Sequence, residues 1–442
     1  MPDSARSDDP AVQAQLDRLE MPSPGRDVLG LSRIATLLDR LGNPQDGLPP
    51  VFHVAGTNGK GSTCAFLRAM IEAGGKRVHA YTSPHLVRFN ERIRVAGELI
   101  DDAALAPLLA EVLDCSEDIA PSFFEATTAA ALLVFARTPA DACVIEVGLG
   151  GRLDATNIIA APAICGIAAL GIDHREFLLA PEAGTPTDDL ARIAWEKAGI
   201  AKSGVPLVTQ KYPAEMNQAI LAAASAAHAP LYPRGEAWDA GVYDERLHYS
   251  DGFGKMTLPV PRMKGAHQAD NAALAIAMLR HQRAFRLPPG AYRAGIEWAN
   301  WPARLQLLDD GPLRRLLPER TRLWLDGGHN PAAALTLAEF LRGEDRPATI
   351  VLGLLANKDL AGFLDPLAGL DLDFVAVPVP DHAHHAPDAI ARAVRARGGE
   401  CITAPEVTAA LKTIETPPPL VLIAGSLYLA GDVLRANRQL PR

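Results

Sequence analysis

The chain has few of the residues and patterns that mark several common classes of protein. Cysteines number only five in 442 residues, and they lack the spacing of metal ligands or of a disulfide framework. Such a set predicts buried thiols in a reducing cytosol, with a catalytic thiol as the less favoured alternative. Residues 1–10 are acidic and polar, unlike a secretory signal, so we expect a cytoplasmic protein. The cysteines are Cys64, Cys115, Cys143, Cys165 and Cys401.

Long apolar runs and an excess of positive charge are also missing. No stretch approaches the ~20 uninterrupted apolar residues of a membrane-spanning helix. The formal net charge of −9 argues against nucleic acid as the main partner, because such partners require a basic face. The composition is globular, with 48% apolar residues, and a length of 442 residues predicts two domains.

The most informative segment is Val-Ala-Gly-Thr-Asn-Gly-Lys-Gly-Ser, residues 54–62. An apolar run at 51–54 predicts a buried strand, the glycines permit a tight turn close to a ligand, and residues 62–73 favour a helix. Backbone N–H groups, the helix N-terminus and the charge of Lys60 would then surround phosphate groups. The pattern predicts a nucleoside triphosphate site, with a ligand-free glycine turn as the weaker alternative. Its residues are Gly56, Thr57, Asn58, Gly59, Lys60, Gly61 and Ser62.

Gly61 stands where the usual phosphate loop has Ser or Thr, whose hydroxyl reaches Mg²⁺. The magnesium ligands must therefore come from elsewhere in the chain. Ser83, Glu146 and His174 follow three predicted strands, and open parallel sheets bind ligands at the carboxyl ends of their strands. A hydroxyl, a carboxylate and an imidazole can complete a Mg²⁺ shell shared with triphosphate oxygens. The alternatives are a lysine-paired carboxylate for Glu146 and a loop-capping role for His174.

Strands and helices alternate along the chain. A first series, with strands predicted at 51–56, 77–81, 142–147, 163–170 and 206–209, has the rhythm of a parallel sheet. Residues 235–262 alternate polar and aromatic positions, which predicts a small antiparallel excursion. A second, shorter series follows Trp301-Pro302, so we place a boundary near residue 301. The expected class is α/β: a P-loop ATPase domain with a mostly parallel sheet over residues 1–300, and a smaller Rossmann-like α/β domain over residues 301–442.

Longer motifs follow one another between residues 51 and 433. They are Gly56-Thr57-Asn58-Gly59-Lys60-Gly61-Ser62, Thr82-Ser83-Pro84-His85-Leu86, Phe89-Asn90-Glu91-Arg92-Ile93, Glu146-Val147-Gly148-Leu149-Gly150-Gly151-Arg152-Leu153-Asp154-Ala155-Thr156-Asn157, Glu196-Lys197-Ala198-Gly199-Ile200, Asp326-Gly327-Gly328-His329-Asn330-Pro331 and Gly425-Ser426-Leu427-Tyr428. In this order the motifs resemble those of the bacterial bifunctional folylpolyglutamate synthase and dihydrofolate synthase family. That family is the folate branch of the Mur-ligase-like amide ligases, and a loop with Gly61 is the variant that this branch carries.

The resemblance implies roles that composition and spacing do not. Ser83, Glu146 and His174 match the magnesium ligands of the family. Lys197 matches a lysine that the family carries as a carbamate, which helps to hold a second magnesium. From the sequence alone, Lys197 would be an ordinary surface lysine. The resemblance implies that Lys60, Lys197 and His174 form the catalytic set.

Further residues match the ligand contacts of the family. Phe124 resembles a pterin-side contact because a flat ring can stack, and Asp154 resembles another because a carboxylate can accept from a pterin amino group. Arg304 lies just past the expected domain junction, from where it can reach the phosphates. One segment departs from the family, since residues 178–188 form a longer link than usual ahead of the helix that carries the matching lysine. The matching nucleotide contacts are Asn271, Arg304, Asp326 and His329.

The reaction implied by the resemblance is an ATP-dependent ligation. ATP phosphorylates a carboxylate, the amino group of L-glutamate attacks the acyl phosphate, and an amide, ADP and phosphate result. We expect a monomer. Its expected partners are small molecules: ATP with Mg²⁺, L-glutamate, and dihydropteroate, tetrahydrofolate or both. The first domain would hold the triphosphate and the pteroate or folate, and the second would hold glutamate. The sequence shows no obvious catalytic base. The alternatives are a ligase of the same fold acting on another acid, such as a cell-wall precursor, and a non-catalytic nucleotide-binding protein.

Overall fold

Short apolar runs form the strands of a large, mostly parallel sheet. In the residues that the computed structural model describes, 6–20, 29–344 and 347–441, this sheet has eight strands in the order β4-β3-β2-β5-β1-β6-β7-β8. Neighbours from β2 to β8 in this order are parallel, and β3 and β4 are antiparallel at one edge. The bounds are β1 Val51–Ala55, β2 Val78–Tyr81, β3 Ile93–Val95, β4 Glu98–Leu99, β5 Ala142–Glu146, β6 Ile164–Ile167, β7 Leu207–Thr209 and β8 Leu231–Pro233.

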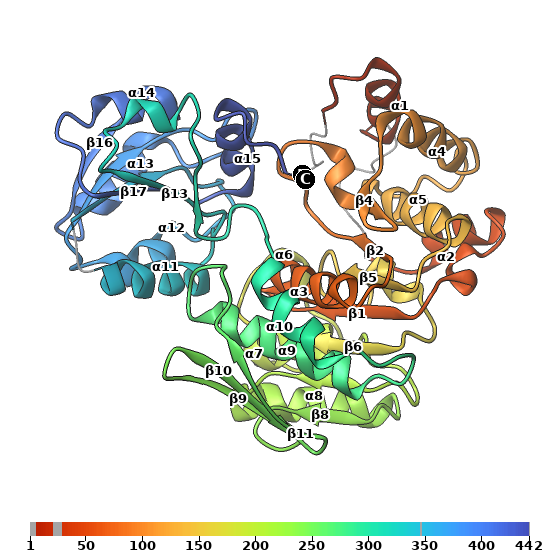
Figure 1. The fold of residues 1–442 in the computed structure, drawn as a ribbon. Helices are drawn as coiled ribbons and strands as arrows, with labels where there is room; N and C mark the ends of the chain where they lie inside the picture. The colour runs from red at the N-terminus through yellow and green to blue at the C-terminus, as the bar shows by residue number, and fades with distance from the viewer. Residues whose placement is uncertain (1–5, 21–28, 345–346, 442) are drawn as a thin grey trace. The chain divides into compact units, whose positions relative to one another are not determined.

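Helices cover both faces of this sheet (Figure 1). Successive residues of a strand point to opposite faces. In β6, Cys165 packs with side chains of α7 and α8, whereas Gly166 lies against Met278 of α9. Both faces are buried, which explains why the parallel strands are continuous apolar runs. The helices here are α1 Pro10–Glu20, α2 Ser32–Arg40, α3 Lys60–Ala73, α4 Asp102–Asp114, α5 Phe123–Arg137, α6 Arg175–Leu178, α7 Asp189–Ala198, α8 Ala214–Ala226, α9 His267–His281 and α10 Pro289–Trp298.

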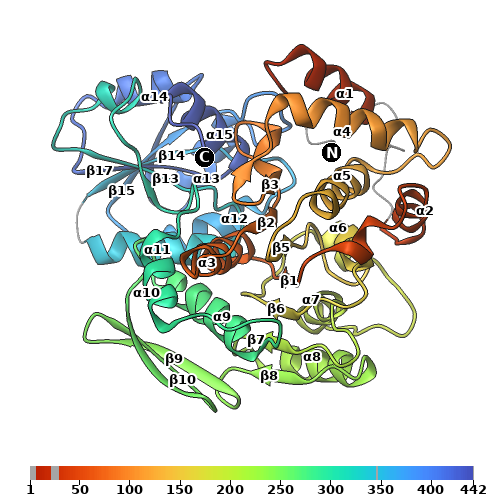
Figure 2. The same cartoon turned by 45° about the vertical axis from the view of Figure 1, so that its right-hand side comes forward.

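A small antiparallel sheet interrupts the alternation of strands and helices. It consists of β9 Trp238–Tyr243, β10 Arg246–Asp251 and β11 Gly254–Pro259. Figure 2 shows β9 and β10 apart from the large sheet, on the side of α9. The side chain of Trp238 is buried and stacks on Tyr249, with ring centroids 6.0 Å apart. The antiparallel excursion predicted at 235–262 is therefore confirmed.

The C-terminal segment forms a second α/β sheet. Within the described ranges it has six strands in the order β12-β13-β17-β14-β15-β16, all parallel except β12. Both figures show α11 and α12 on one side of this sheet and α14 on the other. The strands are β12 Gln306–Leu307, β13 Arg322–Leu325, β14 Ala348–Leu352, β15 Leu372–Ala376, β16 Glu400–Thr403 and β17 Leu420–Ala424, and the helices are α11 Pro331–Glu344, α12 Leu360–Leu364, α13 Pro387–Arg395, α14 Val407–Thr413 and α15 Leu427–Ala436.

The described residues divide into two compact units. The first holds the chain up to Arg262 and the segment Gln268–Asn300, and the second holds Met263–His267 and the chain from Trp301. The predicted α/β class, with one mostly parallel sheet and a second, smaller one, is confirmed. In the part of the chain that the structure describes, no helix has the length and apolar character to cross a membrane.

Candidate active site

The phosphate loop is a turn between β1 and α3. Gly56 has a φ of +152° and Gly59 a φ of +81°, values that residues with a Cβ rarely adopt. A Cβ on Gly59 would also collide with the side-chain amide of Asn271 in α9, so glycine is required for this close approach. The Nζ of Lys60 donates to the carbonyl oxygen of Gly56 at 3.1 Å. The turn, its lysine and Asn271 are therefore gathered in one place.

The rest of the loop is fixed by the segment that follows β6. The N–H groups of Thr57 and Asn58 donate to the carbonyl oxygen of Ala169, at 2.8 and 3.1 Å. Gly61 and Ser62 are buried in the first turn of α3. The helix therefore begins at its lysine, two residues before the predicted start, and its N-terminus faces the loop as an anion site requires.

Ser83 and Glu146 come together at the carboxyl ends of β2 and β5. These strands are neighbours, with Tyr81 opposite Ile145, and β1 lies on the other side of β5, with Val54 opposite Glu146. Glu146 is only 4% exposed, and its Oε2 accepts from the N–H of Ser83 at 3.2 Å. The structure thus places both residues at the carboxyl ends of neighbouring strands, beside the phosphate loop.

His174 follows β6, which is the neighbour of β1 on its other side. It is exposed, has a φ of +51° and precedes α6. Its roles as a magnesium ligand and as a member of the catalytic set stay predictions.

The donors at this edge fit a magnesium ion that is shared with phosphate. Among the described residues, no group of three or more His, Cys, Asp or Glu side chains gathers that could hold a metal by itself. The carboxylate of Glu146 and the hydroxyl of Ser83 are oxygen donors, which magnesium prefers. Phosphate oxygens and water would have to complete such a shell.

Lys197 in α7 is buried beside the phosphate loop. Its Nζ donates to the carbonyl oxygen of Gly56 at 3.0 Å, and the residue is 4% exposed. Burial, and after it the nearby charge of Lys60, lowers the pKa of Lys197 to about 7. The alternative of an ordinary surface lysine is therefore wrong. A large share of this amine is neutral near pH 7, which makes it nucleophilic.

Phe124 and Asp154 both contact the turn that follows β5. The ring of Phe124 lies against Gly148, where a Cβ would collide with it, and its centroid is 5.8 Å from that of Tyr81. Asp154 is 2% exposed, and its Oδ2 accepts from the N–H of Leu149 at 2.8 Å. Burial raises the pKa of Asp154. Contacts of the two side chains with a ligand stay predictions.

In the second unit, Arg304, Asp326 and His329 gather around the end of β13. Asp326 follows this strand and accepts from the N–H groups of Leu305 and Gly328, at 2.8 and 2.7 Å. The carboxylate thereby joins the segment that carries Arg304 to the turn that leads to His329. The Nδ1 of His329 lies 2.9 Å from the carbonyl oxygen two residues before it. Their contact with nucleotide stays a prediction.

Comparison with known proteins shows the family of the chain. A family model described as Mur ligase, glutamate ligase domain, matches residues 314–427. The dihydrofolate synthase/folylpolyglutamate synthase of Escherichia coli (strain K12) is 36% identical over 354 residues, which cover 79% of this chain and 78% of that protein. The chain belongs to the dihydrofolate synthase/folylpolyglutamate synthase family.

Solved structures of this family have the same fold. E. coli FolC in complex with DHPP and ADP has a TM-score of 0.85 and 31% identity, and the match covers 98% of each chain. A bifunctional folylpolyglutamate synthase/dihydrofolate synthase with Mn, AMPPNP and L-glutamate bound has a TM-score of 0.82 and 31% identity, over 96% of this chain and 97% of that one. Both relatives were solved with a nucleotide, and the second also holds a divalent metal.

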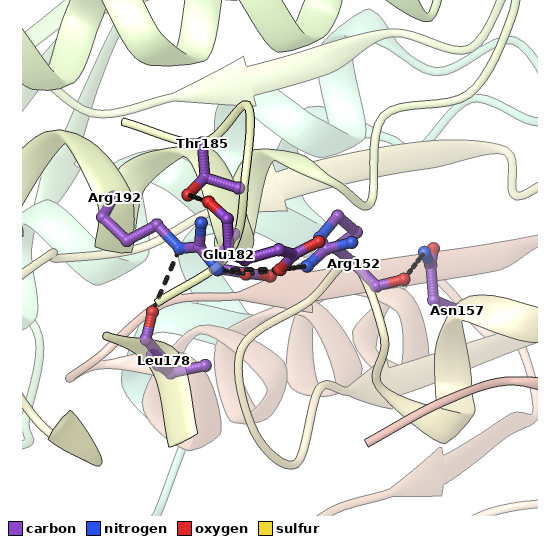
Figure 3. Close-up of polar contacts among 7 residues, drawn as sticks. Arg152, Asn157, Leu178, Glu182, Thr185 and Arg192 are labelled. Atoms are coloured by element: carbon purple, nitrogen blue, oxygen red, sulfur yellow. Dashed lines mark hydrogen bonds and ion pairs between the residues drawn. The ribbon is translucent and has the colours of Figure 1, made fainter. Parts of the chain in front are cut away.

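The link over residues 178–188 is held by ion pairs, as Figure 3 shows. The Oε2 of Glu182 accepts from Arg152 Nη2 at 2.6 Å and from Arg192 Nη2 at 3.0 Å. Both arginines also pair with Glu196, at 3.1 and 2.9 Å. We call these four residues the link cluster. Because Glu196 precedes the buried lysine of α7, the cluster fastens the link to the helix that carries that lysine.

The sequence predictions missed one buried group beside the family's site. His53 is fully buried within β1, and its Nε2 lies 2.8 Å from the hydroxyl oxygen of Thr156. The signal that could have pointed to it is a histidine in the middle of an apolar strand. Cys64 in α3 is buried near the loop, as predicted for the thiols of this chain. Burial, and after it the charge of Glu146, raises the pKa of this thiol well above its ordinary value, which suits a structural thiol.

Proposed function

We propose that the protein adds L-glutamate to the carboxylate of a pteroyl or folyl substrate, with ATP as the source of energy. One observation carries the proposal. The amines of Lys60 and Lys197 converge on the carbonyl oxygen of Gly56, at the sheet edge that also presents Ser83 and Glu146. In a member of the dihydrofolate synthase/folylpolyglutamate synthase family, this arrangement supports an ATP-dependent ligase that also uses a divalent metal.

Phosphorylation overcomes the poor electrophilicity of a carboxylate. A carboxylate oxygen of the substrate attacks the γ-phosphorus of ATP, the bond to ADP breaks, and an acyl phosphate forms. The amino group of L-glutamate then attacks the acyl carbon, loses a proton and expels phosphate, which leaves an amide. Lys60 and the N–H groups of the first turn of α3 stabilise the charge on the transferred phosphoryl group.

Ser83, Glu146 and His174 would hold Mg²⁺, and Lys197 as a carbamate would help to hold a second ion. When bound, the metal neutralises charge on the phosphate oxygens and fixes their geometry. The lowered pKa of Lys197 favours carbamate formation, because only the neutral amine adds to CO₂.

The remaining candidate residues divide between the ring of the substrate, the nucleotide and glutamate. Phe124 would stack on the pteroyl ring, and Asp154 would accept from its amino group. We assign the binding of glutamate to residues 301–442. The match of residues 314–427 to a glutamate ligase domain supports this assignment. The five cysteines, all within the described ranges, are free thiols, which supports a cytoplasmic setting. The residues proposed to contact the nucleotide are Asn271, Arg304, Asp326 and His329.

A substrate panel tests the proposal. Amide formation and phosphate release are measured with ATP, Mg²⁺ and L-glutamate, and with dihydropteroate, tetrahydrofolate or an unrelated acid as the acceptor. We expect turnover that needs both L-glutamate and a pteroyl or folyl acid. The turnover of Lys60→Ala should be at least about a hundredfold lower than that of wild type, because a charge that stabilises the transition state is gone. Lys211→Ala removes an exposed lysine and should keep full activity.

Two outcomes of this panel would contradict the proposal. Turnover with an unrelated acid alone would make the chain a ligase of the same fold with another substrate. Absence of any ATP-dependent turnover by folded wild-type protein would make it a non-catalytic nucleotide-binding protein.

A further inference from the structure

A histidine lies in the middle of the central strand β1, among apolar residues. His53 is fully buried and lies opposite Ile145 of β5 and Cys165 of β6. A polar ring in such a place is costly unless it forms a hydrogen bond. Its Nε2 lies 2.8 Å from the hydroxyl oxygen of Thr156, which belongs to the 3-10 turn η3, Ala155–Ile158.

The contact continues from Thr156 to the candidate substrate residues. The hydroxyl of Thr156 donates to Asp154 Oδ1, and its N–H donates to the same oxygen at 3.0 Å. The other oxygen, Oδ2, accepts from the N–H of Leu149 at 2.8 Å. Leu149 follows Gly148, against which the ring of Phe124 lies. One chain of hydrogen bonds thus leads from β1 to Asp154 and on to the turn against which the ring of Phe124 packs.

The direction of this chain follows from the number of protons. Asp154 accepts in each of the three hydrogen bonds above, and a hydroxyl has one proton, so Thr156 gives its proton to Asp154 and accepts from His53. His53 must therefore carry its proton on Nε2. In the described part of the chain its Nδ1 has no partner, which is consistent, because an unpaired lone pair is tolerated better than an unpaired buried N–H.

The imidazole of His53 is neutral in this buried position. Burial, and after it the charge of Lys202, lowers the pKa of His53 to about 3. At physiological pH the ring therefore has one proton, and the hydrogen bond to Thr156 holds that proton on Nε2.

We propose that His53 and Thr156 are positioning residues for the pteroyl substrate, acting through Asp154. They hold the carboxylate in one orientation and leave a lone pair of Oδ2 for an amino group of a fused, hydrogen-bonding ring. Through Leu149 they also fix the turn against which Phe124 packs. The inference rests on the proposed function, since it takes Asp154 as a contact of the substrate ring.

Two matched variants of Thr156 test the inference. Thr156→Val removes the hydroxyl and keeps the shape, whereas Thr156→Ser keeps the hydroxyl. The dissociation constant of dihydropteroate is measured without ATP, by its fluorescence, and KM values are measured in the complete reaction. We expect Thr156→Val to weaken dihydropteroate binding about tenfold, the loss typical of one buried hydrogen bond to a charged group. The KM for ATP should not change, and Thr156→Ser should bind like wild type.

Further variants separate positioning from loss of stability. His53→Leu removes the first donor at a similar volume and should weaken binding as Thr156→Val does. Thr321→Val, in the second unit, removes an equally buried hydroxyl that donates to the carbonyl oxygen of Pro418 at 2.9 Å. It should leave binding unchanged. Asp154→Asn tests the contact itself and should weaken binding at least as much as Thr156→Val.

The other outcomes contradict either the inference or the assignment of Asp154 to the substrate site. Normal binding by folded Thr156→Val, together with weak binding by Asp154→Asn, would reduce the hydrogen-bond chain to a structural role. Normal binding by Asp154→Asn would remove Asp154 from the substrate site, and the inference with it, while glutamate addition by the wild type would still stand. If Thr156→Val does not fold, comparison of His53→Leu with Thr156→Ser decides in the same way.

Discussion

Lys197 and Lys60 both direct their amines at the carbonyl oxygen of Gly56, at 3.0 and 3.1 Å. Two positive charges so close repel each other, and burial adds to the cost of the charged form of Lys197. When a neutral amine adds to CO₂ and loses a proton, the product is a carbamate with a negative charge. At Lys197 this reaction would replace a repulsion between two cations by an attraction between opposite charges.

We therefore expect Lys197→Ala to be at least about a hundredfold less active than wild type. The variant cannot form the carbamate, so its negative charge is missing. Acetate should restore part of the activity, and removal of bicarbonate should slow the wild type reversibly. After addition of ¹³CO₂, ¹³C NMR should detect a carbamate in wild type and not in Lys197→Ala. Lys202, whose pKa burial also lowers, provides the control, and Lys202→Ala should keep the signal. Wild type without a carbamate signal would contradict this prediction.

Glu146 permits a second test at the scale of one residue. Glu146→Gln keeps the shape and the contact with the N–H of Ser83 but removes a negative charge that a metal would use. The magnesium concentration for half-maximal activity should rise by at least about tenfold, since even indirect partners of metal ligands change affinity by that much. Glu98→Gln, at an exposed position, is the control. Identical activation curves for Glu146→Gln and wild type would make Glu146 structural.

Single residues differ in how far the sequence reveals them. Ser83 and Glu146 were predicted to lie close together because each follows a strand, and parallel strands end at one edge. The burial of Lys197 was not predictable from composition or spacing, because it depends on the packing of α7 against the loop. The contact between His53 and Thr156 joins residues 103 positions apart, and no local pattern predicts such a pair.

At the scale of elements, α7 has two faces with different tasks. One face presents the buried lysine to the phosphate loop, and the other is fastened to residues 178–188 by the link cluster. Trp195 adds to this face, because the guanidinium groups of Arg152 and Arg192 lie 4.6 and 5.1 Å from the centre of its ring. We infer that the link restrains the helix that carries the candidate carbamate.

Glu182→Gln should loosen α7, because two arginines then share Glu196 alone. Hydrogen–deuterium exchange over residues 189–198 should become faster, and high salt should reduce the difference from wild type. Glu176→Gln removes another exposed carboxylate, outside the cluster, and should leave exchange unchanged. Exchange at the same rate in both variants would mean that the link does not restrain the helix.

The contribution of Glu182 to the stability of α7 has a defined pH dependence. The hydrogen bond from Arg192, and with it that from Arg152, lowers the pKa of Glu182. A carboxyl group whose pKa is lowered by folding stabilises the fold above its ordinary pKa, and this stabilisation is lost as the pH falls through the lowered value. The difference between wild type and Glu182→Gln should therefore disappear in acid.

Some elements were hidden from the sequence pattern. Helix α4 contains Pro107, and a proline inside a helix normally predicts a break. The helix forms because Asp101 caps it and because Leu105, Leu109 and Val112 are buried in the core. Tertiary packing therefore outweighs the local preference. The strands were easier, because apolar runs of four or five residues bounded by turn residues have few other structures open to them.

At the scale of the whole molecule, the α/β class and the sheet edge that carries the site were predictable, but the order of the strands was not. Alternation of strands and helices requires parallel neighbours with crossover connections. It does not say that β1 lies between β5 and β6, which depends on how the apolar side chains of all strands pack together. The contacts within the link cluster were hidden for the same reason, since they join residues 152, 182, 192 and 196.

This strand order has a consequence for the synthesis of the chain. The hydrogen bond between Lys197 and Gly56 spans 141 residues, so at about 5–20 residues per second Gly56 is made about 7–28 seconds before its partner. Both β5 and β6, which flank β1 in the finished sheet, are made within this interval, and β1 has no partner until β5 appears, whereas β2 is soon followed by its partner β3. The central strand is therefore the longest-lived unpaired apolar segment of the growing first sheet. It is the segment that a chaperone at the ribosome would have most reason to cover.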